Sequence, residues 1–85
     1  RKNFRLGMAY YANQDLTKAI VRLKKTVEAS DVQISTADLN TAKWNLGMAY
    51  AKQEKPENAI LYFNELTQSN NAYSQKASEL IQKMK

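Results

Sequence analysis

Apolar residues recur at steps of three and four along most of the chain, the spacing of an α-helix that buries one face. The pattern predicts helices over residues 3–13, 16–29 and 36–53, a fourth that begins at Pro56, and a last one over about 71–84. Pro56 suits the first turn of a helix, where no amide donor is needed. No segment alternates with a period of two, so no β-strand is expected. The sequence therefore predicts an all-α fold.

Short polar segments separate the predicted helices and hold residues that can cap them. Asp15 closes the first turn and can accept hydrogen bonds from the first free amides of the second helix. Ser35 and Asp38 have the spacing of an N-capping box at the start of the third helix. Tyr10 is expected in the core. The other expected buried positions are Leu16, Ala19, Ile20, Leu23 and Val27, then Ala59, Ile60, Phe63 and Leu66, and finally Tyr73, Ala77, Leu80, Ile81 and Met84.

The pentapeptide Leu-Gly-Met-Ala-Tyr occurs twice, at residues 6–10 and 46–50, so its copies lie forty residues apart. Ala19-Ile20 returns as Ala59-Ile60 at the same offset. Glycine inside a helix costs about 0.5–1 kcal/mol relative to alanine. A chain that carries it at the same place in two copies is expected to bring two helices into contact there. Repeated helix–turn–helix units are typical of a solenoid.

Leu46, Gly47, Tyr50, Ala59 and Phe63 follow the pattern of a tetratricopeptide repeat (TPR), and Leu6, Gly7, Tyr10, Ala19 and Leu23 follow it a second time. The chain thus resembles the TPR family. The resemblance implies one domain over 1–85, with a unit over about 3–29, a connector at 30–35, a second unit over about 36–69 and a capping helix over about 71–84. The antiparallel helix–turn–helix units would stack as a short right-handed solenoid.

Three features depart from the family pattern. The copies are forty residues apart, against about thirty-four in the family. Phe4 and Trp44 stand two residues before the leucine, which places them toward the inner face of the repeat, and the usual closing proline is missing. The displaced Trp44 and the last segment are also similar to C-terminal repeat segments of certain bacterial proteins, some of which carry a membrane anchor upstream.

The resemblance implies a non-catalytic scaffold that holds a peptide or protein segment in a concave groove. The mapped groove residues are Phe4, Arg5, Met8, Tyr11, Trp44, Asn45, Met48 and Lys52, flanked by Ala12, Thr41, Ala51, Ser74, Gln75 and Ser78. Helix contact explains Leu46, Gly47 and Tyr50, whereas helix pairing is not expected to explain Trp44 and Met48. The alternative is a structural or oligomerisation segment, whose inner face is covered by a second copy in a homodimer or by upstream repeats.

The chain has no histidine and no cysteine, so the commonest proton shuttle, thiol nucleophile and zinc ligands are missing. Carboxylates, lysines and tyrosines have the spacing of exposed helix faces. We therefore expect no catalytic residues, no metal ligands, no cofactor and no enzymatic activity.

The net charge of +5 is unevenly placed, because residues 1–25 carry seven Lys or Arg against Asp15 alone. A solvated helix face is the expected explanation, and nucleic-acid binding is not expected because Tyr11 alone could stack on bases. No apolar run approaches the roughly 20 residues of a membrane-spanning helix. The chain begins at Arg1, so we expect a piece of a longer protein, which is cytoplasmic or, if an upstream segment anchors it, attached to a bacterial membrane.

Overall fold

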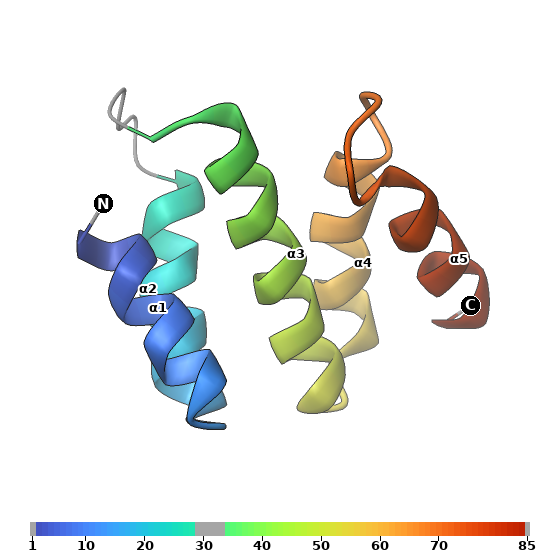
Figure 1. The fold of residues 1–85 in the computed structure, drawn as a ribbon. Coiled ribbons are helices and arrows are strands. Elements are labelled where there is room, and N and C mark those ends of the chain that lie inside the picture. The colour runs from blue at the N-terminus through green and yellow to red at the C-terminus, as the bar shows by residue number, and fades with distance from the viewer. Residues whose placement is uncertain (1, 29–33, 85) are drawn as a thin grey trace.

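The computed structural model describes residues 2–28 and 34–84. Within these ranges the backbone forms five α-helices and no β-strand. The helices are α1 (Lys2–Ala12), α2 (Leu16–Glu28), α3 (Thr36–Lys52), α4 (Pro56–Leu66) and α5 (Ser74–Met84), as Figure 1 shows. The predicted all-α fold is confirmed. Ala29 and residues 30–33 of the expected connector lie outside the described residues.

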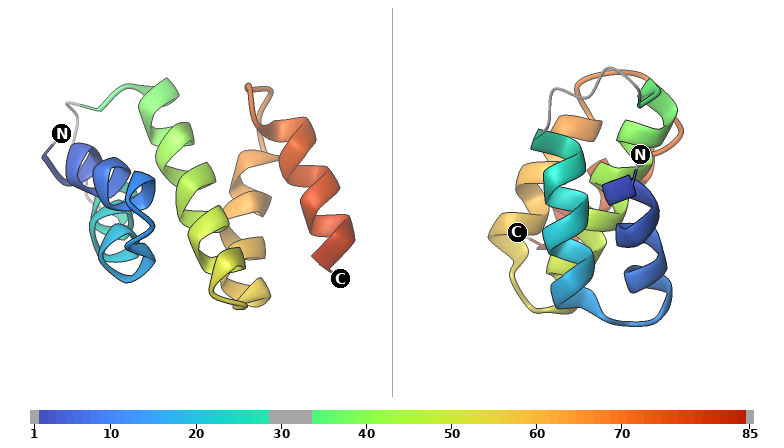
Figure 2. Two further views of the ribbon diagram at one scale, coloured as in Figure 1. Left: turned by 60° about the horizontal axis from the view of Figure 1, so that its bottom comes forward. Right: turned by 90° about the vertical axis from the view of Figure 1, so that its left-hand side faces the viewer.

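The helices form two antiparallel hairpins and a last single helix. α1 packs on α2 and α3 packs on α4, while α2 also contacts α3 and α5 packs on α4. In the right-hand view of Figure 2, α1 and α3 form one layer and α2 and α4 the other. This arrangement is a short helical-repeat solenoid. None of the helices in the described ranges is long and apolar enough to cross a membrane.

The two glycines mark the closest approach of the helices in each hairpin. A Cβ atom on Gly7 of α1 would lie 2.7 Å from Cγ and Cδ2 of Leu23 on α2. A Cβ atom on Gly47 of α3 would lie 2.6 Å from Cε1 of Phe63 on α4. In both hairpins the glycine meets the side chain sixteen residues later. The repeated glycine therefore has the predicted role: it lets two helices touch.

The turns inside the two hairpins are also copies of one another. Gln14 and Glu54, forty residues apart, both have left-handed backbones, with φ of 67° and 59°. The amide of Asp15 donates to the carbonyl of Tyr10 at 2.9 Å, and the amide of Lys55 donates to the carbonyl of Tyr50 at the same distance. A left-handed residue followed by such a long backward hydrogen bond is the Schellman ending of a helix. Both hairpins thus reverse direction in the same way.

The predicted caps are present. Asp15 Oδ1 accepts a hydrogen bond from the Lys18 amide at 3.3 Å. Ser35 Oγ accepts from the Asp38 amide at 3.1 Å, and Pro56 occupies the first turn of α4. The starts of α2, α3 and α4 were therefore readable from the sequence.

The core follows the predicted faces with some differences. Its buried apolar residues are Ala19, Leu23, Ala42, Leu46, Ala49, Tyr50, Ala59, Tyr62, Phe63, Leu66, Ala77 and Ile81. Leu16, Ile20, Val27, Ile60, Tyr73, Leu80 and Met84 are only half-buried. The expectation that Tyr10 is buried is wrong, because no described helix covers the outer side of the first hairpin, and its ring stays half-exposed. Tyr62, which the sequence pattern had not singled out, is buried and stacks on Tyr50, with ring centroids 5.9 Å apart.

The last helix begins at Ser74, later than the expected start near residue 71. Asn71 explains the delay, because its side chain holds the preceding turn. Its amide nitrogen donates to the Leu66 carbonyl at 2.9 Å, and its Oδ1 accepts from the Tyr73 amide at 2.8 Å. Tyr73 consequently lies at the entrance of α5, where its carbonyl accepts from the Ala77 amide at 2.8 Å.

Candidate functional site

One side of α1 carries a stripe of large, half-buried side chains. Phe4, Met8 and Tyr11 are spaced by four and three residues, so they share one side of the helix. All three are half-buried and pack against the core cluster. Arg5 is exposed. The stripe is thus a largely apolar and partly exposed surface, and the positively charged Arg5 follows Phe4 in the sequence.

A second stripe lies at the equivalent place on α3. Trp44 and Met48 stand forty residues after Phe4 and Met8 and are likewise half-buried. Lys52 brings the two stripes together, because its Nζ lies 4.8 Å from the centre of the Tyr11 ring. A lysine ammonium within about 6 Å of an aromatic face is attracted to it. This contact between α3 and α1 places the stripes next to each other.

Trp44 is also part of an aromatic cluster that joins α3, α4 and the turn before α5. Its ring stacks on Tyr73, with centroids 5.4 Å apart and an interplanar angle of 17°, and lies 5.3 Å from the Phe63 ring. The hydroxyl of Tyr73 is hydrogen-bonded to the hydroxyl of Thr41 at 2.9 Å. The expectation that helix packing leaves Trp44 unexplained is therefore wrong, because it fills the junction of α3, α4 and the entrance of α5.

Asn45 already uses part of its hydrogen-bonding capacity within α3. Its amide nitrogen donates to the Thr41 carbonyl at 2.9 Å, one helical turn earlier. The Oδ1 atom remains as the acceptor of that side chain. Asn45 thus keeps both its Oδ1 acceptor and the second hydrogen of its amide nitrogen for further contacts.

A cavity of about 450 Å³ lies between the first turns of α3 and the segment before α5. Its lining residues carry no charge, and most of the surface that they expose to the cavity is apolar: Thr36, Ala37, Asn40, Thr41, Asn70, Asn71, Ala72 and Tyr73. The cavity continues the α3 stripe by one helical turn, since Thr41 precedes Trp44 by three residues. Sequence reasoning placed only Thr41 near the groove and missed the cavity, because the segment from Asn70 to Tyr73 has no periodic pattern.

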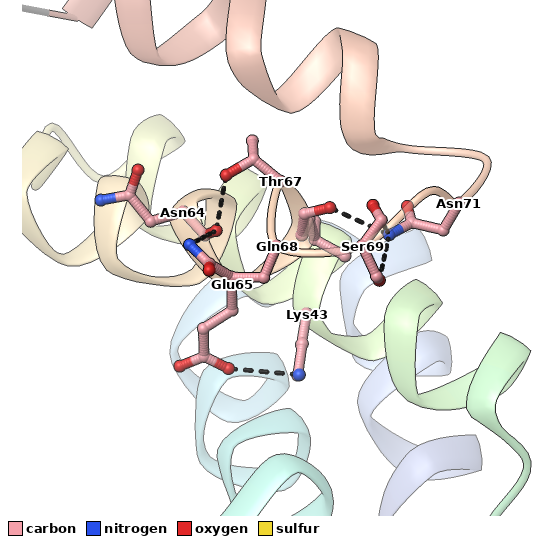
Figure 3. A network of polar contacts seen from close by, with 8 residues as sticks. Lys43, Asn64, Glu65, Thr67, Gln68, Ser69 and Asn71 are labelled. Carbon is pink, nitrogen blue, oxygen red and sulfur yellow. Dashed lines mark hydrogen bonds and ion pairs between the residues drawn. The ribbon is translucent and has the colours of Figure 1, made fainter.

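The loop between α4 and α5 is held by side chains of its own residues, as Figure 3 shows. The Asn71 amide nitrogen also donates to the Ser69 carbonyl at 3.2 Å, and Thr67 Oγ1 donates to the Asn64 carbonyl at 2.7 Å. Beside the loop, Lys43 of α3 pairs with Glu65 of α4 at 3.2 Å. The hydrogen bonds of Asn71 thus hold one wall of the cavity without the closing proline of the family pattern.

The charged and titratable groups of the described residues do not converge on one point. Arg22 Nη1 donates to Asn3 Oδ1 at 3.1 Å, and Lys18 pairs with Asp15 at 3.8 Å. Burial raises the pKa of the Tyr62 hydroxyl above 10.0, and Tyr50, Glu28 and Glu65 raise it further. In residues 2–28 and 34–84, no group of three His, Cys, Asp or Glu side chains could hold a metal ion. The half-buried stripes, rather than a charged centre, make up the candidate site.

The fold and the stripes define the chain as a helical-repeat protein. Profiles of the tetratricopeptide repeat match residues 3–29 and residues 41–73, which together cover most of the chain. The chain belongs to the tetratricopeptide repeat family. No curated protein and no solved structure matches it. Repeats of this family generally mediate protein–protein interaction and are typically non-catalytic scaffolds.

Proposed function

We propose that this domain is a non-catalytic scaffold that binds a peptide or protein segment along the inner side of α1 and α3. The supporting observation is the pair of matching stripes, Phe4 with Met8 and Trp44 with Met48, joined by the contact of Lys52 with Tyr11. Aromatic and methionine side chains in a groove are good anchors for the apolar side chains of a partner. Arg5, Asn45 and Lys52 supply polar contacts at its edge.

The proposed peptide continues from the stripes into the cavity beside α5. Thr36, Asn40 and Asn70 line this cavity and carry no charge. Hydroxyl and amide groups can donate to and accept from a peptide backbone, whereas a charged wall would select one sign of side chain. The bound segment would therefore place apolar side chains on Met8 and Met48 and polar backbone in the cavity.

Trp44 is the only tryptophan, so its fluorescence reports on binding in the groove. Peptides selected from a random displayed library on the wild-type protein would be titrated against the wild type, Met48→Lys and a charge-matched control, Gln82→Lys, at an exposed site of α5. We expect Met48→Lys to weaken binding at least tenfold, or about 1.4 kcal/mol, and Gln82→Lys to leave it unchanged. Selected peptides that bind Met48→Lys as tightly as the wild type would overturn the proposed groove.

A further inference from the structure

The outer side of the first hairpin repeats a surface that the second hairpin buries. Ala42, Leu46 and Ala49 share one side of α3 and are fully buried. Gln53, on the same side, donates to Thr17 of α2 at 3.3 Å, so this side of α3 faces α2. The residues forty positions earlier are uncovered: Lys2 and Ala9 are exposed, and Leu6 is half-buried. The first hairpin therefore has a stacking surface with no described helix on it.

Beside this surface lies a hollow of about 260 Å³, lined by Tyr10, Thr17, Lys18, Val21 and Arg22. The counterparts of Thr17, Lys18 and Val21 in the second hairpin are Glu57, Asn58 and Leu61, which are exposed. Tyr10 and Arg22 are the counterparts of the stacked pair Tyr50 and Tyr62 in the second hairpin. Val21 is 49% exposed, and Lys18 Nζ lies 5.7 Å from the centre of the Tyr10 ring. Sites for drug-sized ligands measure about 300–1,000 Å³. The hollow is better suited to a single aliphatic side chain with acidic neighbours.

α4 carries a matching feature on its solvent side. Leu61 is 57% exposed, and it and Val21 are the exposed large hydrophobic residues of the described chain. Glu57 and Glu65 stand one turn before and one turn after Leu61, so the three residues share one side of α4. Lys43 pairs with Glu65 but leaves 43% of the Glu65 side chain exposed. The chain thus displays an exposed leucine between two carboxylates.

We propose that copies of this chain associate head to tail, with Leu61 of one copy in the hollow of the next. Glu57 and Glu65 then lie near Lys18 and Arg22, and the leucine contacts Val21 and the Tyr10 ring. Lys18 also pairs with Asp15, and Glu65 with Lys43, so each patch keeps a net charge of one unit and the two signs are opposite, as expected for patches that meet. A contact between two different patches repeats in one direction, and it builds a closed ring if its rotation closes and an open chain if it does not. Small interfaces are weak, so the assembly is concentration-dependent.

The proposed contact uses none of the stripe residues on α1 and α3. It does not rest on the proposed peptide groove, and either can fail without the other. If both hold, one assembly presents several grooves in a row, which strengthens binding to a partner that carries several copies of the recognised segment.

Two variants with the same charge change test the proposal by sedimentation. Val21→Lys blocks the hollow and Leu61→Lys blocks the leucine patch, and both positions are exposed enough to tolerate the change. We expect the weight-average mass of the wild type to rise above 9.7 kDa between about 10 µM and about 1 mM. Each variant alone should remain at the mass of one chain. An equimolar mixture should form a dimer and nothing larger, because only one intact hollow and one intact leucine patch can meet.

Gln82→Lys on α5 is the matched control and should associate as the wild type does. Added salt should weaken the association, because the charges lie at the surface. A wild type that stays monomeric up to about 1 mM would overturn the proposal. So would association that both lysine variants leave intact, or a mixture that remains monomeric. If Met48→Lys abolished the association while both Val21→Lys and Leu61→Lys kept it, the contact would lie on the inner side of the domain. That result would also overturn the proposal.

Discussion

Gly47 and Phe63 lie so close that a methyl group on the glycine would come within 2.6 Å of the phenyl ring. The ring cannot retreat easily, since Phe63 is fully buried and packs against Trp44. The first hairpin repeats the relationship with Gly7 and Leu23. The spacing of the two helices in each hairpin is therefore set by one glycine and one large side chain.

Gly47→Ala is expected to destabilise the domain by roughly 1–2 kcal/mol. Overpacking a core costs about 1–3 kcal/mol, and the better helix propensity of alanine returns about 0.5–1 kcal/mol. Urea denaturation followed by circular dichroism would measure the loss. Phe63→Leu removes part of the ring that meets the new methyl group, so Gly47→Ala should cost less in that background. A double-mutant cycle should therefore give a coupling free energy different from zero. Additive effects of the two substitutions would contradict the contact.

Trp44→Ala is expected to cost about 2–3 kcal/mol, somewhat less than the 3–5 kcal/mol typical of a fully buried aromatic residue, because Trp44 is half-buried. The loss comes from its contacts with Phe63 and Tyr73. Met48→Ala should cost less, about 1–2 kcal/mol. Chemical denaturation of both variants checks the order. Equal losses would mean that the aromatic cluster adds nothing to stability.

Glu54→Gly is expected to stabilise the domain by about 0.5–1 kcal/mol, because Glu54 has a left-handed backbone that glycine adopts without strain. Gln14→Gly, at the equivalent turn, should do the same. Lys24→Gly, at an exposed position inside α2, should instead cost about 1 kcal/mol. Thermal unfolding would separate the outcomes, since 1 kcal/mol shifts the Tm of a domain of this size by about 4–8 °C.

Much of this architecture follows from local sequence. Caps, the proline and the three- and four-residue periodicity locate all five helices, with the start of the last one placed too early, and the repeated glycine predicts the contact inside each hairpin. The Trp44–Tyr73 stack is not predictable in the same way, because Tyr73 belongs to a turn held by the side chain of Asn71. The hollow beside Val21 could not be predicted for a different reason, because its exposure depends on which helices cover α1. The repeat predicts that Tyr10 is buried as Tyr50 is, and the structure shows that it is not. Gln14 and Glu54 are forty residues apart, like the two glycines, and this offset could have predicted that the turns inside the two hairpins have the same backbone conformation.

Stability should fall at alkaline pH in a way that depends on Tyr62. Burial raises the pKa of this hydroxyl in the folded state, with Tyr50, Glu28 and Glu65 adding to the effect. The folded protein therefore holds this proton more tightly than the unfolded chain. The stabilisation is fully present below the unfolded value near 10 and is lost as the pH rises above it. Denaturation curves from pH 8 to 11 should show a steeper decline for the wild type than for Tyr62→Phe. Parallel pH profiles of the two proteins would contradict the assignment.

The side-chain hydrogen bonds of Asn71 have a consequence for how the domain comes apart. α1 to α4 support one another as paired helices, whereas α5 packs mainly on α4, through Ala77 and Ile81. The turn that joins α4 and α5 is held by hydrogen bonds of Asn71 and of other side chains of the loop. Proteins open in cooperative units of unequal stability, and the unit with the fewest contacts opens first. α5 is that unit, so its amides should exchange with solvent earlier than those of the hairpins. Tyr73 lies at the entrance of α5 and stacks on Trp44, so the release of α5 would also loosen that stack, and the last helix helps to hold the aromatic cluster together.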